Sequence, residues 1–79
     1  MSPAEAWSPQ EAERALLEAI ADRKLRRRDI AVIYNRALHA DYGIDWAKVN
    51  LAIRRRWSLA ALNYIKHLAW DSIKPRRMQ

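Results

Sequence analysis

The sequence predicts a small all-α protein, a bundle of four short helices with a helix-turn-helix-like C-terminal pair, in one domain spanning residues 1–79. Apolar residues recur at intervals of three and four, as on one face of a helix. Only one glycine and three prolines interrupt the chain, and no run of Val, Ile and Thr alternates with polar residues as a strand does. Cysteine is absent, which excludes disulfides and thiolate metal sites.

The first helix is expected over residues 8–25, after an N-terminal arm of residues 1–7. Ser8, Pro9 and Glu11 indicate its start, because Ser caps the first turn, Pro suits the first position and Glu completes a capping box. Leu17 lies beside the face that should point inward. That face consists of Ala12, Leu16, Ala19, Ile20 and Arg23.

The second helix is expected over residues 29–41 and the third over residues 45–56. Asp29 suits the cap or first turn of the second helix, and Gly43 should end it, because glycine adopts a left-handed conformation at little cost. Asp45 should cap the third helix. The inward positions are predicted to be Ile30, Ile33, Tyr34, Ala37 and Leu38 in the second helix, and Trp46, Val49 and Ile53 in the third.

The segment around Trp57 and Ser58 allows two interpretations. A break would let Ser58 cap a fourth helix over residues 58–73, followed by a basic tail over residues 74–79. A continuous helix would instead place Trp57, Ala60 and Tyr64 on the stripe that begins at Trp46. We favour the break, because three arginines followed by Ser are typical of one helix ending and another starting. The inward residues would then be Leu62, Ile65, Ala69 and Ile73.

Positive charge gathers in two runs, at residues 24–28 and 54–56. The net charge is +6, and residues 24–56 alone contain nine basic and three acidic side chains. Both runs lie where a predicted helix ends or begins, so the charge should concentrate at corners of the bundle. This pattern is typical of a surface that binds a polyanion, with an affinity that falls steeply as salt rises.

The segment 48–68 resembles the helix-turn-helix DNA-binding proteins. Ala52, Ser58, Leu62 and Ile65 have that family's spacing of a small residue, a helix cap and two apolar positions. The segment departs from the pattern at Arg56, where the turn usually has Gly, and also at Arg55 and Leu51. The resemblance implies that residues 58–66 lie along the major groove. The same spacing also occurs in ordinary helical hairpins, which leaves simple packing as the alternative.

The predicted function is that of a small cytoplasmic nucleic-acid-binding protein, a helix-turn-helix regulator of transcription of phage or mobile-element type that binds duplex DNA. RNA binding cannot be separated from DNA binding by composition. The alternative is a protein–protein interaction module, an inhibitor or accessory subunit that docks an apolar helical face into a homodimer or a larger assembly. The predicted nucleic-acid contacts are Arg26, Arg27, Arg28, Arg54, Arg55, Arg56, Ser58, Leu59, Asn63 and Lys66.

Other kinds of function find little support in the sequence. No catalytic constellation, cofactor motif or small-molecule site is present, and His39 and His67 are too isolated to predict a metal site. No apolar stretch approaches the ~20 residues of a membrane span. The four tryptophans could stack on single-stranded nucleic acid. We instead expect Trp7, Trp46, Trp57 and Trp70 to fill the core of so short a chain.

Overall fold

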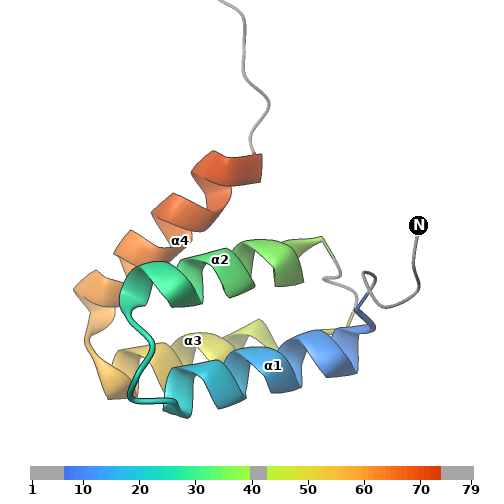
Figure 1. Ribbon diagram of the computed structural model, residues 1–79, viewed down its shortest axis with the longest axis horizontal. Coiled ribbons are helices and arrows are strands. Elements are labelled where there is room, and N and C mark those ends of the chain that lie inside the picture. The colour runs from blue at the N-terminus through green and yellow to red at the C-terminus, as the bar shows by residue number, and fades with distance from the viewer. Residues whose placement is uncertain (1–6, 40–42, 74–79) are drawn as a thin grey trace, which may run out of the picture.

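The computed structural model describes residues 7–39 and 43–73, with side chains as far as residue 71. It contains helices α1 (Pro9–Ala21), α2 (Arg27–Leu38), α3 (Trp46–Arg56) and α4 (Leu59–Ile73), and no strand within these residues (Figure 1). The predicted all-α bundle of four helices is therefore confirmed. Most of the predicted N-terminal arm and all of the basic tail lie outside the described residues.

The four helices form a compact bundle in which α4 crosses the others at an angle (Figure 1). α1 and α3 run in the same direction, and α2 runs opposite to them. α1 and α4 each pack against both α2 and α3, whereas the backbones of α2 and α3 are not neighbours. The directions of α1, α2 and α3 alternate, so α1 and α3 end where α2 begins, on the left in Figure 1. α4 also begins at this end of the molecule.

The core lies between the helices, and its inward faces are largely those predicted. Tyr34 joins α2 to α3: its hydroxyl donates to Asn50 Oδ1 at 2.9 Å, and its ring centroid lies 4.8 Å from that of Trp46. Ala31 and Ala61 are also buried, because α2 and α4 pack closely. The predicted residues that are buried are Ala12, Leu16, Ala19, Ile20, Ile30, Tyr34, Ala37, Val49, Ile53, Leu62, Ile65 and Ala69.

α1 begins as predicted but ends at Ala21, four residues early. Ser8 Oγ accepts from Glu11 N at 3.2 Å, and Glu11 Oε1 accepts from Ser8 N at 2.9 Å, which forms the expected capping box. The hydrogen bond from the Ser8 backbone is the main reason that the pKa of Glu11 is lowered. At the other end, Asp22 is extended and its Oδ1 accepts from Lys24 N at 2.9 Å, so a turn replaces the last helical turn. Arg23 is consequently exposed instead of inward.

α2 extends from Arg27 to Leu38, a span shifted toward the N-terminus from the predicted 29–41. Asp29 occupies the first turn, where its Oδ2 accepts from Arg26 N at 2.8 Å, so the helix begins before it. Gly43 has the expected positive φ, +83°, but it lies in the connection to α3, several residues beyond the end of α2. Residues 40–42 lie outside the described part of the chain.

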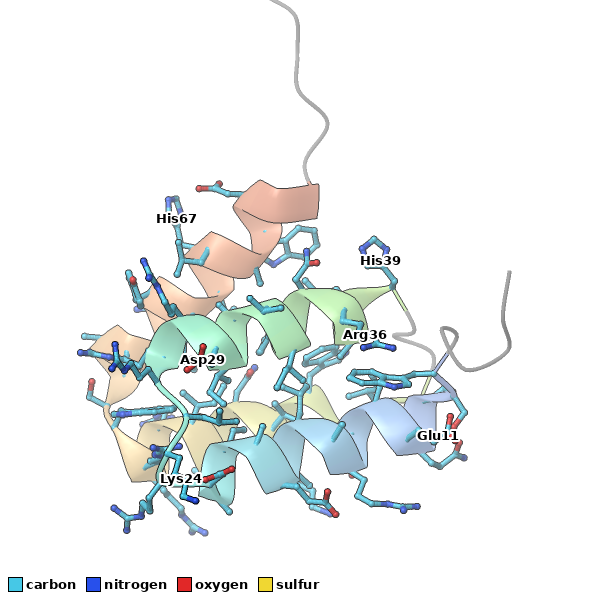
Figure 2. All side chains as sticks on the ribbon, viewed as in Figure 1. Glu11, Lys24, Asp29, Arg36, His39 and His67 are labelled. Carbon is cyan, nitrogen blue, oxygen red and sulfur yellow. The ribbon has the colours of Figure 1, made fainter. Side chains whose placement is uncertain are left out.

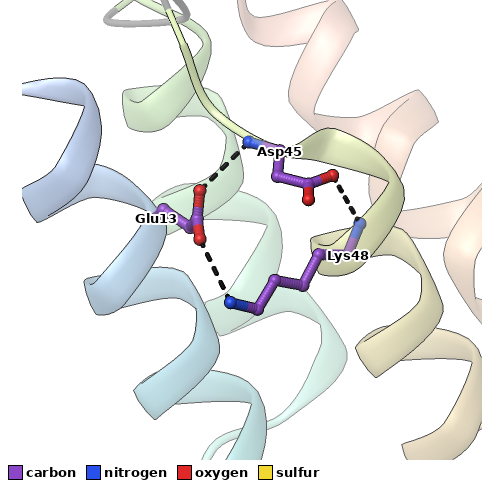
Figure 3. A network of polar contacts seen from close by, with 3 residues as sticks. All are labelled: Glu13, Asp45 and Lys48. Carbon is purple, nitrogen blue, oxygen red and sulfur yellow. Dashed lines mark hydrogen bonds and ion pairs between the residues drawn. The ribbon is translucent and has the colours of Figure 1, made fainter.

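Asp45 caps α3 as predicted, and Glu13 of α1 supports the same corner (Figure 3). Asp45 Oδ1 accepts from Lys48 N at 3.1 Å. Glu13 Oε1 accepts from Asp45 N at 3.0 Å, and Glu13 Oε2 lies 3.5 Å from Lys48 Nζ. The Glu13 carboxylate therefore connects the start of α3 to α1.

The break between α3 and α4 is present, which excludes the continuous helix. Trp57, with φ −120° and ψ −81°, leaves the helical conformation, and Ser58 starts the next helix. Ser58 Oγ accepts from Ala61 N at 3.0 Å, and Ser58 O accepts from Leu62 N at 3.1 Å. The Ser cap and the two-residue connection turn α4 away from α3, toward α2.

Candidate nucleic-acid interface

The net positive charge of the chain is concentrated at the end where the four helices meet. Residues 22–29 and 54–56 contain eight basic and two acidic side chains, a net charge of +6. The complete sequence has the same net charge, so its remaining residues sum to zero. Figure 2 shows nitrogen-tipped side chains extending from this end, around Lys24 and near Asp29. We call residues 22–29 and 54–56 the basic end.

Arg26, Arg27 and Arg28 are exposed at the start of α2. Together with Tyr64 of α4 they line an open pocket of about 370 Å³, which we call the arginine pocket. The Arg27 guanidinium carbon lies 5.9 Å from the centroid of the Tyr64 ring. Among the residues that the structure describes, no acidic side chain lines the arginine pocket, so its electrostatic potential favours an anion.

Arg54 and Arg55 are exposed on the last turn of α3, but Arg56 is positioned differently. Its Nη1 donates to the carbonyl oxygens of Ile20 at 2.8 Å and Asp22 at 2.9 Å, and its Nη2 donates to that of Leu25 at 2.8 Å. Its guanidinium also lies 4.1 Å from the centroid of the Trp57 ring.

Arg56 is thus used inside the protein, where it joins α3 to the end of α1 and the connection that follows. The sequence contained a signal for this role. Position 56 is three residues beyond buried Ile53 and seven beyond buried Val49, the spacing of one helical face. Arg54 and Arg55 fall outside that stripe and remain exposed.

The residues predicted on α4 are only partly at the basic end. Ser58 lies in the connection beside Arg56 and uses its hydroxyl as a cap, and Leu59, 54% exposed, begins the helix. Asn63 is exposed one turn later, and Lys66 is half-buried about 10 Å further along the axis than Leu59. Leu59, Asn63 and Lys66 follow one edge of α4, because they are spaced by four and three residues.

Tyr64 lies on the side of α4 that faces the start of α2, and 47% of its surface is exposed. A second pocket of about 370 Å³, which we call the apolar pocket, adjoins the arginine pocket and shares Arg28 and Tyr64 with it. Sequence reasoning did not identify this pocket, since the pairing of α2 with α4 is not encoded locally. The apolar pocket is also lined by Asp29, Ala31, Val32, Asn35 and Leu68.

The tryptophans occupy two kinds of environment. Trp7, Trp46 and Trp57 pack half-buried against the core, as predicted, and the Arg36 guanidinium lies 4.1 Å from the Trp7 ring centroid. The prediction was wrong for Trp70, which is 50% exposed. Its neighbour Ala69 takes the inward position, so Trp70 falls on the outer face of α4.

Two kinds of site are absent from the described residues. No group of three or more His, Cys, Asp or Glu side chains there is arranged to hold a metal ion. No helix within residues 7–39 and 43–73 has both the length and the apolar character needed to cross a bilayer. Comparison of the chain with known protein families, with curated proteins and with solved structures found no match.

Proposed function

We propose that this protein binds nucleic acid in the cytoplasm, with its basic end on the phosphate backbone of duplex DNA. The observation that supports this most strongly is the net charge of +6 on the residues of the basic end, where α4 also begins. Arginine binds phosphate well because its planar guanidinium offers several donors. The proposed phosphate contacts are Arg26, Arg27, Arg28, Arg54 and Arg55; Arg56 holds these elements together.

In this proposal α4 reads the DNA as the second helix of a helix-turn-helix. The bend at Trp57 and Ser58 starts α4 at the basic end, and Leu59 and Asn63 are exposed in its first two turns. An Asn side chain can bond adenine bidentately, and Leu can contact a thymine methyl group. The two-residue connection is shorter than the three to four residues usual in that motif. A regulator of transcription in a phage or mobile element is the biological role that we propose.

A salt titration of duplex binding tests the proposal. The double variant Arg54→Ala/Arg55→Ala should bind every duplex more weakly and flatten the slope of log K against log salt by about 1.8, roughly 0.9 for each lost phosphate contact. The matched control is Arg14→Ala/Lys48→Ala, which removes the same charge from exposed positions outside the basic end. Equal slopes for the two double variants would contradict the proposal.

The base-reading part has its own test, which uses duplexes that differ in sequence. Asn63→Ala should change the preference among them and leave the average affinity nearly unchanged, because phosphate contacts do not depend on sequence. An unchanged ranking of sequences would remove α4 from the proposed interface and leave only the arginines.

A second candidate function is a protein–protein interaction module that uses the outer edge of α4. Leu59 and Trp70 are 54% and 50% exposed and, with Asn63 between them, lie on one edge of the helix. Light scattering distinguishes the two functions: an oligomer that forms at high concentration, dissociates in Leu59→Ser/Trp70→Ser and has no affinity for nucleic acid would favour this module.

A further inference from the structure

Tyr64 lines two pockets of different character in the cleft between α2 and α4. On one side is the arginine pocket, formed by three exposed guanidiniums. On the other is the apolar pocket, whose walls include Ala31, Val32 and Leu68. Val32 is 70% exposed although it is strongly apolar. The two pockets thus place an anion site and an apolar site next to the same aromatic ring.

We propose that this composite cleft binds a single unpaired nucleotide, with its base in the apolar pocket against Tyr64 and its phosphate in the arginine pocket. This rests on the proposed function and deepens it, because it names an unpaired nucleotide as the ligand of this part of the interface. Aromatic side chains next to cationic ones are the usual platform for unpaired bases. Each pocket, at about 370 Å³, is within the range of small-ligand sites.

Two polar side chains that line the apolar pocket, Asn35 and Asp29, indicate which bases fit. Asn35 Nδ2 donates to the Ala69 carbonyl oxygen at 2.9 Å, which fixes the amide and leaves Oδ1 as an acceptor. Asp29 Oδ2 accepts from Arg26 N, which leaves the second carboxylate oxygen as another acceptor. Acceptors suit a base with an exocyclic amino group, so adenine or cytosine should bind better than thymine.

The same carboxylate argues against an acidic peptide as the occupant. A peptide with acidic residues could satisfy the three arginines, but its chain would continue past Asp29 into the apolar pocket, where like charges repel. A nucleotide avoids this repulsion, because its charge is confined to the phosphate and its base is neutral.

Amide NMR spectra and binding titrations of the full chain test the proposal. Adenosine monophosphate and a five-nucleotide oligodeoxyadenylate should shift the amides of residues 26–32 and of Tyr64. Tyr64→Ala should weaken binding of both about tenfold, because it removes the stacking surface, whereas Tyr64→Phe should bind like the parent protein. Trp70→Ala is the matched control, an equally exposed aromatic on the same helix that lines neither pocket.

The outcomes also separate the two sources of the nucleotide. If the oligodeoxyadenylate binds more than tenfold tighter than adenosine monophosphate, the natural ligand is a nucleic-acid strand. If the two affinities are equal, the natural ligand is a free nucleotide. Both results support the site. Three results would overturn the proposal. Tyr64→Ala could bind both nucleotides as tightly as the parent protein, or inorganic phosphate alone could give the same amide shifts and the same affinity as adenosine monophosphate. The third result is an acidic peptide that shifts the amides of residues 26–32 and of Tyr64 when neither nucleotide does.

Failure here is distinguishable from failure of the proposed function. In the proposed function, blunt duplex binding depends on the phosphate contacts of five arginines, among which Arg54 and Arg55 do not line the cleft. The loss of duplex affinity in Arg54→Ala/Arg55→Ala should therefore be the same in the presence and in the absence of Tyr64→Ala. Duplex binding with no Tyr64-dependent nucleotide binding would reject this inference alone. Tyr64-dependent nucleotide binding with no duplex affinity would reject the duplex-binding proposal and keep the cleft.

Discussion

The Nη1 nitrogen of Arg56, the last residue of α3, lies 2.8 Å from the carbonyl oxygen of Ile20, the next-to-last residue of α1. The same guanidinium bonds the carbonyls of Asp22 and Leu25. Carbonyl groups at the end of a helix lack the amide partners that a further turn would supply. One arginine from another helix therefore provides donors where α1 ends, and a cationic group there also suits the negative end of the helix dipole.

Replacing Arg56 should destabilise the fold. Arg56→Ala is expected to lower the free energy of unfolding by about 2 kcal/mol, since three charge-assisted hydrogen bonds are lost at a half-buried site where water replaces part of them. Arg56→Lys should also destabilise, because an ammonium lacks the planar fork that reaches three carbonyls. Urea unfolding measures both.

The control for this prediction is Arg55→Ala, which removes the same charge from an exposed neighbour. It should change the free energy of unfolding by no more than about 0.5 kcal/mol. If Arg55→Ala and Arg56→Ala are equally destabilising, the carbonyl contacts contribute nothing beyond charge.

Ser58 should contribute to stability through its cap on α4. Ser58→Ala removes the acceptor for Ala61 N and is expected to cost about 1 kcal/mol. Ser58→Asp keeps an acceptor and adds a negative charge at the start of the helix, so its free energy of unfolding should be close to that of the parent protein. Thermal and urea unfolding of the three proteins test this; equal stability of the Ala and Asp variants would be inconsistent with a capping role.

The stability of the protein should fall at alkaline pH because of Tyr34. Burial raises the pKa of its hydroxyl to about 12, although the hydrogen bond to Asn50 opposes the shift. In the unfolded chain the group loses its proton near pH 10. The contribution of Tyr34 is therefore complete below about pH 10 and declines between about pH 10 and 12, by on the order of 2–3 kcal/mol.

Tyr34→Phe isolates this effect, because lysines also titrate in the same range. The variant should lose about 1 kcal/mol at pH 8, where the bond to Asn50 is removed. The gap between parent and variant should then shrink or reverse as pH rises from 10 to 12. A gap that stays constant in urea unfolding across this range would show that Tyr34 does not titrate as proposed.

Glu13 should matter more for stability than the lysine with which it pairs. Glu13→Ala removes the acceptor for Asp45 N at the entry of α3 and should cost about 1 kcal/mol. Lys48→Ala breaks only an ion pair whose lysine side chain is 58% exposed, so the change should be about 0.5 kcal/mol or less. Urea unfolding of Glu13→Ala and Lys48→Ala in low and in high salt measures both losses of stability. A larger loss in Lys48→Ala than in Glu13→Ala would contradict this prediction.

The sequence by itself determined the four helices, their caps and most of their inward faces. Ser8, Asp45 and Ser58 cap as expected, and the break at Trp57 is present. These features are predictable because capping bonds connect residues three apart, and a helical face repeats every three to four residues. Both depend on the local chain alone.

Only the tertiary structure decided which side chains meet across helices. The end of α1 at Ala21 depends partly on Arg56, 35 residues later, and Arg27 meets Tyr64 only because α4 packs on α2. Residue spacing defines the faces of each helix, but the partner of a face is set by packing between segments far apart in the chain, which no local pattern specifies.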